Sequence, residues 1–353
     1  MQSAQPASGS DSSQLTAIVA NFLPDARVRP LFFAISGGYS SARVWKADVG
    51  GATFALRRWP ADSLPPERVR GLHQLLRHIA NSGVSCVAVP LANPTGQSLV
   101  KVDSHYWQLE PWLPGTADFH ESPSDVRLQN ASRTLADWHL AAARFECPDG
   151  LDWFHSRAGR SPAVLERTRR IESWMNESTL RNVWNGISAE ADSKFRDVAA
   201  RIMKNAKLSL RVVNEELRGM HSVRFQLQPC LRDVWHDHVL FADDTVTGLI
   251  DANACRTENV ATDLARLLGS LVEDDRPRWT FALDAYADVR PLSADELRLV
   301  RVLDRSAVVL SPLTWLHRRY IQRLEFPDHS AVVERLKAQS KRLNTLTQSL
   351  ASS

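Results

Sequence analysis

The sequence predicts an α+β fold in which a small antiparallel β-sheet lobe with one helix precedes a larger, mainly helical lobe. Strand patterns separated by turn signals fill residues 28–113, and Pro114-Gly115 then interrupts the chain. Beyond this break the apolar residues recur mostly at helical spacing. We therefore expect a tail with a short helix at residues 1–27, a small lobe at 28–113, a large lobe at 114–353 and a cleft between the lobes.

The small lobe begins with the strand patterns LFFAI and ARVWKADV, which flank the turn sequence SGGYSS. A third strand, ATFALRR, follows the hairpin signal Gly50-Gly51. The one helix has Pro65-Pro66 at its start and Gly83 just past its end, which is the usual asymmetry of helix boundaries. Two more strands, SLVKV and HYWQLEPW, complete the lobe.

The large lobe opens with a helix that starts near Ser122, where Ser-Pro-Ser-Asp resembles a capping box. One β-rich stretch, CLRDVWHDHVLFADDTVTGLIDA at residues 230–252, stands among the helical patterns. It carries two histidines and several carboxylates around short apolar runs, so it is either an acidic surface hairpin or a metal-binding platform. Further helices are predicted around residues 161–185, 189–220, 259–272, 293–323 and 330–350.

The overall composition excludes several classes of protein. The chain has 353 residues and a net charge of only +3, so neither nucleic acid nor a membrane surface is an expected partner. No apolar run is long enough to cross a bilayer, and the first residues lack the features of a signal peptide. The four cysteines form no CxxC pair, which favours reduced thiols and a cytoplasmic location. The oligomeric state stays open.

The turn SGGYSS could bind the phosphates of a nucleotide, because glycine permits a close backbone approach and serine adds hydroxyl donors. A plain hairpin is an equally good interpretation of the same residues. The candidate nucleotide-binding residues of this turn are Gly37, Gly38, Ser40 and Ser41.

The third strand, ATFALRR, carries two adjacent arginines, Arg57 and Arg58. Side chains alternate along a strand, so one arginine should face the cleft and the other should face solvent. We assign Arg57 to the cleft, where a guanidinium suits phosphate groups. The alternative is that both are solvated residues of an edge strand.

The stretch 230–252 resembles the aminoglycoside phosphotransferase and choline-kinase-like family of the protein-kinase-like superfamily. That family has a catalytic loop of the form H-G-D-x-x-x-x-N and a later I-D motif. In LRDVWHDH, Asp233 matches the catalytic aspartate and His238 matches the asparagine, while Asp251 of LIDA matches the metal-binding aspartate. ATDLARLLGSL resembles the family's next helix, with Asp263 in a structural role. The resemblance covers roughly residues 28–275.

The resemblance implies an ATP-dependent kinase that phosphorylates a hydroxyl of a small molecule. Asp233 would orient the acceptor hydroxyl, while Asp251 and His238 would hold Mg²⁺, or Mn²⁺ in its place. The adenine would lie against the connection WQLEPWLPG, near Glu110 and Trp112. The acceptor itself, and the choice between ATP and GTP, do not follow from the family.

Several departures from the family pattern keep other interpretations open. Arg232 stands where the family has glycine, Arg57 replaces lysine, and the helical position of its usual acidic partner falls near Leu72 or His73. These changes, with His238, favour a nucleotide-binding pseudoenzyme as the main alternative. A third possibility is another kind of metal-dependent protein, with residues 236–238 as half of a zinc site. The acids at residues 273–275 could attract a cationic substrate or form a solvated helix end.

Overall fold

The computed structural model describes residues 4–6, 9–25, 28–35, 42–60, 64–148, 153–326 and 328–352. Its contacts divide the chain into two compact units. Unit 1 consists of Met1–Ser156, His236–Thr257 and Asp288–Arg290, and unit 2 consists of Arg157–Trp235, Glu258–Ala287 and Pro291–Ser353. The lobe boundary at residues 113 and 114 remains a prediction.

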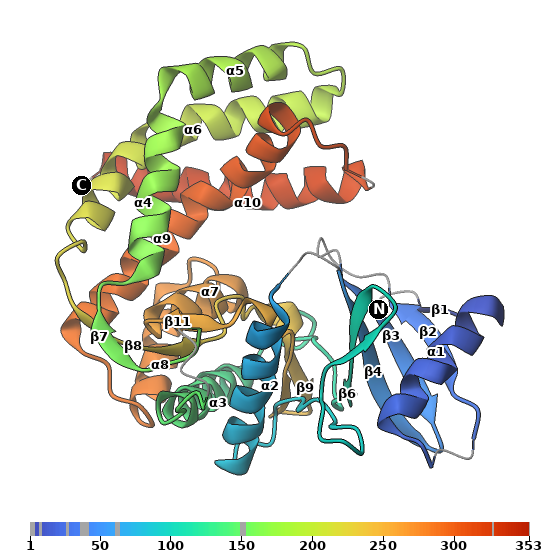
Figure 1. Cartoon of the computed structure of the whole chain (residues 1–353). Coiled ribbons are helices and arrows are strands. Elements are labelled where there is room, and N and C mark those ends of the chain that lie inside the picture. Colours follow the sequence, from blue (N-terminus) through green and yellow to red (C-terminus); the bar gives the residue numbers. More distant parts are fainter. Residues whose placement is uncertain are drawn as a thin grey trace. The chain divides into compact units, whose positions relative to one another are not determined.

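Unit 1 contains a six-stranded antiparallel sheet with the strand order β1-β2-β3-β4-β6-β5 (Figure 1). In the register of β4 with β6, Arg57 lies opposite Gln108 and Arg58 lies opposite Trp107. The strands are β1 (Ala4–Pro6), β2 (Leu31–Ile35), β3 (Arg43–Val49), β4 (Ala52–Trp59), β5 (Val100–Val102) and β6 (His105–Pro111).

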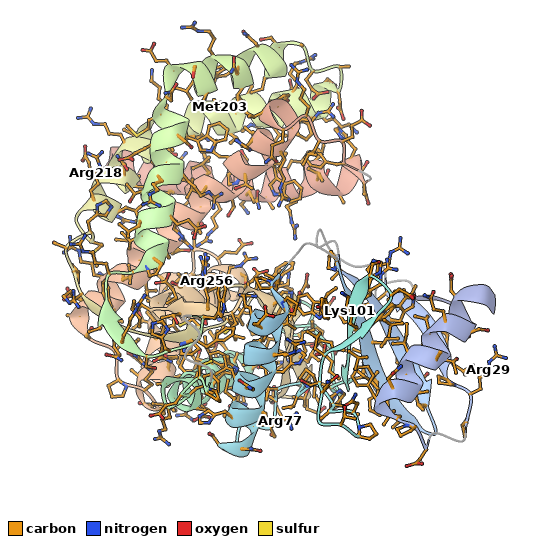
Figure 2. All side chains as sticks on the ribbon, viewed as in Figure 1. Arg29, Arg77, Lys101, Met203, Arg218 and Arg256 are labelled. Carbon is orange, nitrogen blue, oxygen red and sulfur yellow. The ribbon has the colours of Figure 1, made fainter. Side chains whose placement is uncertain are left out.

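One face of this sheet is covered by helix α1 (Gly9–Phe22), drawn in blue beside the strands in Figure 1. Its apolar side chains, Leu15 and Ile18 among them, belong to the same core as Trp45 and Trp107 of the sheet. At the surface, the exposed Arg29 points away from this core (Figure 2). The burial of these apolar groups is what holds α1 on the sheet.

Unit 1 also holds α2 (Pro66–Asn81), α3 (Asp125–Ala143) and a hairpin formed by β9 (Val239–Ala242) and β10 (Thr245–Leu249). The short 3₁₀ helices η1 (His236–His238) and η2 (Ala252–Ala254) lie before and after this hairpin. Backbone hydrogen bonds join Leu249 to Cys86 and Phe241 to Thr116, so the hairpin is fixed to the segments on either side of β5 and β6.

Unit 2 is mainly helical. Helix α6 packs against α10, α4 and α9, and α7 packs against α9. Figure 2 shows Met203 among these helices, where only 5% of it is exposed, and Arg218 at the surface, where it pairs with Glu172. Its helices are α4 (Pro162–Met175), α5 (Glu177–Ser188), α6 (Ser193–Arg218), α7 (Ala261–Leu271), α8 (Arg276–Ala287), α9 (Ala294–Leu316), the π-helix η3 (His317–Ile321) and α10 (His329–Ala351).

Short strands complete the fold. β7 (Arg157–Gly159) pairs with β8 (Phe225–Cys230) in unit 2, and β11 (Arg256–Glu258) carries the chain from unit 1 into unit 2.

The predicted α+β class is confirmed, with an antiparallel sheet in unit 1 and a helical unit 2. The start of the chain differs from the expected tail, because β1 pairs with β2 there and α1 begins at Gly9. Helix α8 was not predicted. No disulfide joins the four cysteines in the described part of the chain. None of the helices in the described part of the chain is both long and apolar enough to span a bilayer.

Candidate active site

Asp251 of unit 1 lies two residues beyond the end of β10, with a left-handed backbone (φ 59°). Aspartate adopts this conformation at a lower cost than most residues, and the turn directs its carboxylate toward three nitrogen donors. Nη2 of Arg57 lies 3.3 Å from Asp251 Oδ1, and Nε2 of His238 lies 3.8 Å from Asp251 Oδ2. Nδ2 of Asn253 donates to Asp251 Oδ1. The structure thus brings together both residues that the sequence predicts as metal ligands.

Arg57 is almost completely buried, with 8% of the residue exposed. Besides Asp251, it faces the Glu110 carboxylate at 3.9 Å. Its Nε has no hydrogen-bond partner among the described residues, although a buried guanidinium nitrogen normally has one. Arg58 turns to the other side of the sheet, over the rings of Trp45 and Trp107. The Nε of Arg57 is thus a buried donor without a partner among the described residues.

Glu110 and Arg57 are the end of a buried polar chain that begins on α2. Nε2 of His73 lies 3.0 Å from Oε1 of Gln108, which also accepts the indole N–H of Trp59 at 2.8 Å. The amide nitrogen of Gln108 then donates to Glu110 Oε2 at 2.7 Å. Because Gln108 Oε1 is an acceptor, Nε2 of His73 must carry its proton. Its Nδ1 then accepts the hydroxyl of Ser98 at 2.8 Å.

Burial shifts the pKa values of the ionisable groups in this series of hydrogen bonds. Loss of solvation lowers the pKa of His73 to about 4, with only partial compensation by the hydrogen bond to Gln108. Burial raises the pKa of Glu110, while Arg57 and Gln108 oppose that shift. His73 is therefore neutral at pH 7, and Arg57 supplies the positive charge that faces Glu110.

The series of hydrogen bonds from His73 to Glu110 accounts for one departure from the family pattern, the missing acidic partner on the helix. His73 of α2, near the position of the usual acidic partner, does not pair with the strand arginine directly. The acid comes instead from β6, as Glu110, in the strand hydrogen-bonded to β4. Glu110 is thus a partner of Arg57. From the sequence we expected Glu110 near the adenine and did not predict this contact.

The other predicted nucleotide contacts are placed only in part. Trp112 is 39% exposed, Lys46 lies over its ring, and its backbone N–H donates to Thr53. The turn residues Gly37, Gly38, Ser40 and Ser41 lie outside the described residues.

The sequence His236-Asp237-His238 does not act as one ligand cluster. His238 turns toward Asp251, whereas the ring of His236 packs edge-on against His120 with centroids 4.4 Å apart. Nε2 of His236 lies 3.5 Å from the carboxylate of Asp237. The described residues thus give no support to a zinc half-site built from all three side chains. A carboxylate with one imidazole suits a divalent ion that can also take phosphate oxygens or water as ligands.

Asp233 belongs to unit 2, and its side chain is 48% exposed. Its Oδ1 accepts hydrogen bonds from Nε and Nη2 of Arg266, at 3.1 and 3.0 Å. Arg266 lies on α7, and its guanidinium also stacks over the ring of Trp235. The carboxylate thus binds Arg266 and remains partly exposed to solvent.

The backbone before Asp233 is held by Asp263, which lies one turn before Arg266 on α7. Its two carboxylate oxygens accept the N–H groups of Leu231 and Arg232, at 2.7 and 2.6 Å. Arg232 has a left-handed backbone (φ 65°), and its guanidinium pairs with Glu166 at 3.0 Å. The arginine therefore adopts the conformation for which glycine is best suited, at the position where the family has glycine.

Of the acids at residues 273–275, Glu273 and Asp275 are exposed, whereas Asp274 is paired within the protein. Asp274 accepts a hydrogen bond from Nε of Arg342 at 2.9 Å, and the same guanidinium binds Asp304 at 2.7 Å. Burial raises the pKa of Asp304, and Arg342 opposes that shift. Arg342 of α10 thus joins Asp274 to Asp304 of α9, so the Asp274 carboxylate is already paired with a cation.

Comparison with known proteins agrees with this geometry. The model of the phosphotransferase enzyme family matches residues 33–298. A homoserine kinase of Methylobacterium radiotolerans is 26% identical over 251 residues, which are 69% of this chain and 67% of that protein. A homoserine kinase of Rhizobium etli is 25% identical over 248 residues, again 69% and 67% of the two chains.

Solved structures show the same fold at low sequence identity. A spectinomycin phosphotransferase, solved with ADP and spectinomycin, has a TM-score of 0.70 at 12% identity, with 98% of both chains covered. A microcompartment-associated aminopropanol kinase has a TM-score of 0.64 at 16% identity, with 96% of this chain and 97% of that chain covered. At these identities the likeness establishes the fold only.

Proposed function

This chain belongs to the phosphotransferase enzyme family, and on that premise we propose that it transfers the γ-phosphoryl group of ATP to a hydroxyl of a small molecule. Phosphoryl transfer requires little covalent chemistry from the protein. The protein must position the two reactants and balance the charge that develops on the phosphoryl oxygens. The residues of unit 1 and unit 2 described above divide these tasks.

In unit 1, Arg57 and Asp251 bind the nucleotide. The buried guanidinium of Arg57 would donate to phosphate oxygens, and its Nε, which has no partner among the described residues, suits such a contact. Asp251 and His238 would hold the divalent ion, which neutralises phosphate charge when it is bound. Glu110 faces the same guanidinium and is itself held by a hydrogen bond from Gln108.

In unit 2, Asp233 acts on the acceptor. Its carboxylate would accept a hydrogen bond from the acceptor hydroxyl, orient the oxygen, and take up the proton as the new O–P bond forms. Asp263 holds the loop before it, and Arg266 sets the direction of the carboxylate. The observation that carries the proposal is the convergence of Arg57 and His238 on the Asp251 carboxylate.

A phosphorylation screen tests the proposal. The protein is incubated with ATP and Mg²⁺ or Mn²⁺, and ADP formation is measured with acceptors that include those named by its relatives: homoserine, aminopropanol and spectinomycin. We also include serine and ethanolamine, because serine and homoserine differ from ethanolamine and aminopropanol mainly by a carboxylate. Acceptor-dependent ADP formation supports the proposal. Metal-dependent ATP binding without turnover on any acceptor would instead favour the pseudoenzyme.

A further inference from the structure

The two carboxylate oxygens of Asp251 have different surroundings. Oδ1 lies 3.3 Å from Nη2 of Arg57 and accepts a hydrogen bond from Nδ2 of Asn253. Oδ2 has only Nε2 of His238 near it among the described residues, at 3.8 Å, which is too long for a hydrogen bond. The side chain of Asp251 is 34% exposed. Oδ2 is therefore the oxygen that is open to an ion.

The orientation of the Asn253 amide follows from its partner. An ionised carboxylate oxygen only accepts hydrogen bonds, so the amide must turn its NH₂ group, and not its oxygen, toward Asp251. Asn253 lies in η2, two residues after Asp251, which keeps the two side chains close together in the chain. Because the amide is uncharged, it is not drawn away from Asp251 by a phosphate group as strongly as a guanidinium is.

The backbone that carries Asn253 is held by Arg68 of α2. Nη2 of Arg68 donates to the carbonyl oxygen of Asn253 at 3.2 Å and to that of Cys255 at 2.7 Å. Only 6% of Arg68 is exposed, and its guanidinium lies 5.8 Å from the ring centres of Trp153 and Phe154. The buried arginine thus fixes η2, and the Asn253 side chain extends toward Asp251 from a fixed backbone.

The two partners of Asp251 Oδ1 should respond differently to a nucleotide. In the proposed function Arg57 donates to phosphate oxygens, and these compete with Oδ1 for its guanidinium. Asn253 is then the partner that remains on Oδ1. A carboxylate with one oxygen held in this way binds an ion through the other oxygen, whereas a released carboxylate can bind through both. Mg²⁺ requires near-octahedral coordination, while Ca²⁺ accepts more oxygen ligands and often both oxygens of one carboxylate.

We propose that Asn253 is a positioning residue that keeps Asp251 a one-oxygen ligand and thereby favours Mg²⁺ over Ca²⁺. The inference rests on the proposed function, in which Asp251 holds the divalent ion, and adds the basis of its choice of ion. Side chains that orient a metal ligand by a hydrogen bond typically contribute about 10- to 100-fold to metal affinity. The loss of Asn253 should fall mainly on Mg²⁺, which tolerates a displaced ligand less well than Ca²⁺ does.

The test measures binding, without turnover. The Kd of AMP-PNP is determined by calorimetric titration with saturating Mg²⁺, with saturating Ca²⁺ and without metal. Asn253→Ala should weaken binding with Mg²⁺ by about 10-fold and binding with Ca²⁺ by less than about 3-fold. Asn253→Leu, which keeps the size of the side chain and removes the amide, should behave in the same way. Asn130→Ala is the control, because its amide donates to the backbone of Asp244 in the turn between β9 and β10.

The other outcomes separate this inference from the proposed function. Equal weakening with both ions in Asn253→Ala, together with a lower thermal midpoint, would mean that Asn253 only stabilises η2, and the proposal is overturned. An Asn253→Leu variant that binds like the wild type would also overturn it, because size alone would then suffice. In both cases the metal assignment of Asp251 still stands. Wild-type binding that does not depend on metal would contradict that assignment, and this inference with it.

Discussion

The two aspartates that we assign to phosphoryl transfer are held in different ways. Asp251 faces the buried Arg57, which is fixed by Glu110 and by a polar chain that continues to His73. Asp233 is half-exposed, and its carboxylate pairs with Arg266 of α7. A buried charge must be compensated by fixed partners, whereas an exposed one is solvated and can change partners.

The difference indicates separate roles for the residues around Asp251 and those around Asp233. The residues around Asp251, which we assign to the metal-bound nucleotide, are largely buried and joined by several polar contacts. Asp233, which we assign to the acceptor, is half-exposed and lies beside Arg266 and its neighbour Trp235. Substitutions in the first set should therefore affect nucleotide binding and stability, and substitutions in the second should affect turnover and acceptor choice.

The largest effect on nucleotide binding is expected from Asp251→Ala. The variant loses the carboxylate that would hold the metal, so metal-dependent ATP binding should weaken by about 100-fold or more. Calorimetric titration with ATP and Mg²⁺ or Mn²⁺ measures this change. Asp237→Ala is the control, because Asp237 is an exposed acid of the same segment. If both variants bind ATP like the wild type, the metal assignment is wrong.

A smaller effect on the same ligand should separate the two neighbouring arginines. Arg57→Ala should weaken ATP binding by about 10-fold or more, because a buried charge-assisted contact to phosphate is lost. Arg58→Ala should have little effect, since Arg58 lies over Trp45 and Trp107 on the other side of the sheet. Thermal denaturation of both variants checks that the fold is intact. Equal losses of affinity would remove the assignment of Arg57.

The sequence predicts some features of these two regions and not others. The start of α2 at Pro66 follows from a local pattern, and Asp233 and Asp251 were assigned because the short motifs around them resemble those of the family. The pairing of Arg57 with Glu110 depends on the register of β4 and β6, which no local pattern reveals. The sequence therefore indicated the assigned groups but not their partners.

The contact between Arg335 and the ring of Trp235 likewise could not be predicted from a local pattern. Arg335 is 100 residues beyond Trp235 in the chain, and only tertiary packing brings the two together. Arg266, the partner of Asp233, could have been found from the sequence, because it follows Asp263 by three residues and so lies on the same side of a helix. Helix α8 was missed because RPRWTFALDAYA has little amphipathic pattern, with Pro277 near its start.

A third prediction uses pH to test the polar chain of unit 1. The pKa of His73 is about 4 in the folded protein and near 6.5 when the chain is unfolded, so the unfolded state binds the proton more readily. The stability contribution of neutral His73 is complete above about pH 6.5 and is lost as the pH falls toward 4. Between pH 7 and 5 the loss should be about 1–2 kcal/mol.

His73→Gln keeps a hydrogen-bond donor near Gln108 and cannot be protonated in this range. Urea denaturation at pH 7, 6 and 5 should show a shallower decline in the free energy of unfolding for the variant than for the wild type. Parallel curves for the two proteins would show that His73 is not buried in its neutral form.

The smallest effect concerns the backbone of the loop before Asp233. Arg232→Gly should be more stable than Arg232→Ala by about 1 kcal/mol, because both variants lose the ion pair with Glu166 but only glycine relieves the left-handed strain. Chemical denaturation compares the two directly. A higher stability of the alanine variant would mean that the loop does not hold this conformation in solution.

The assignment of Asp233 to the acceptor and of Asp251 with Arg57 to the nucleotide is tested most directly by Asp233→Asn. The measurement is kcat with the best acceptor of the screen, together with the Kd for ATP in the presence of metal. The account predicts that kcat falls by about 100-fold or more while the Kd changes by less than about 2-fold. Unchanged turnover, or a loss of ATP affinity as large as that of Asp251→Ala, would contradict it.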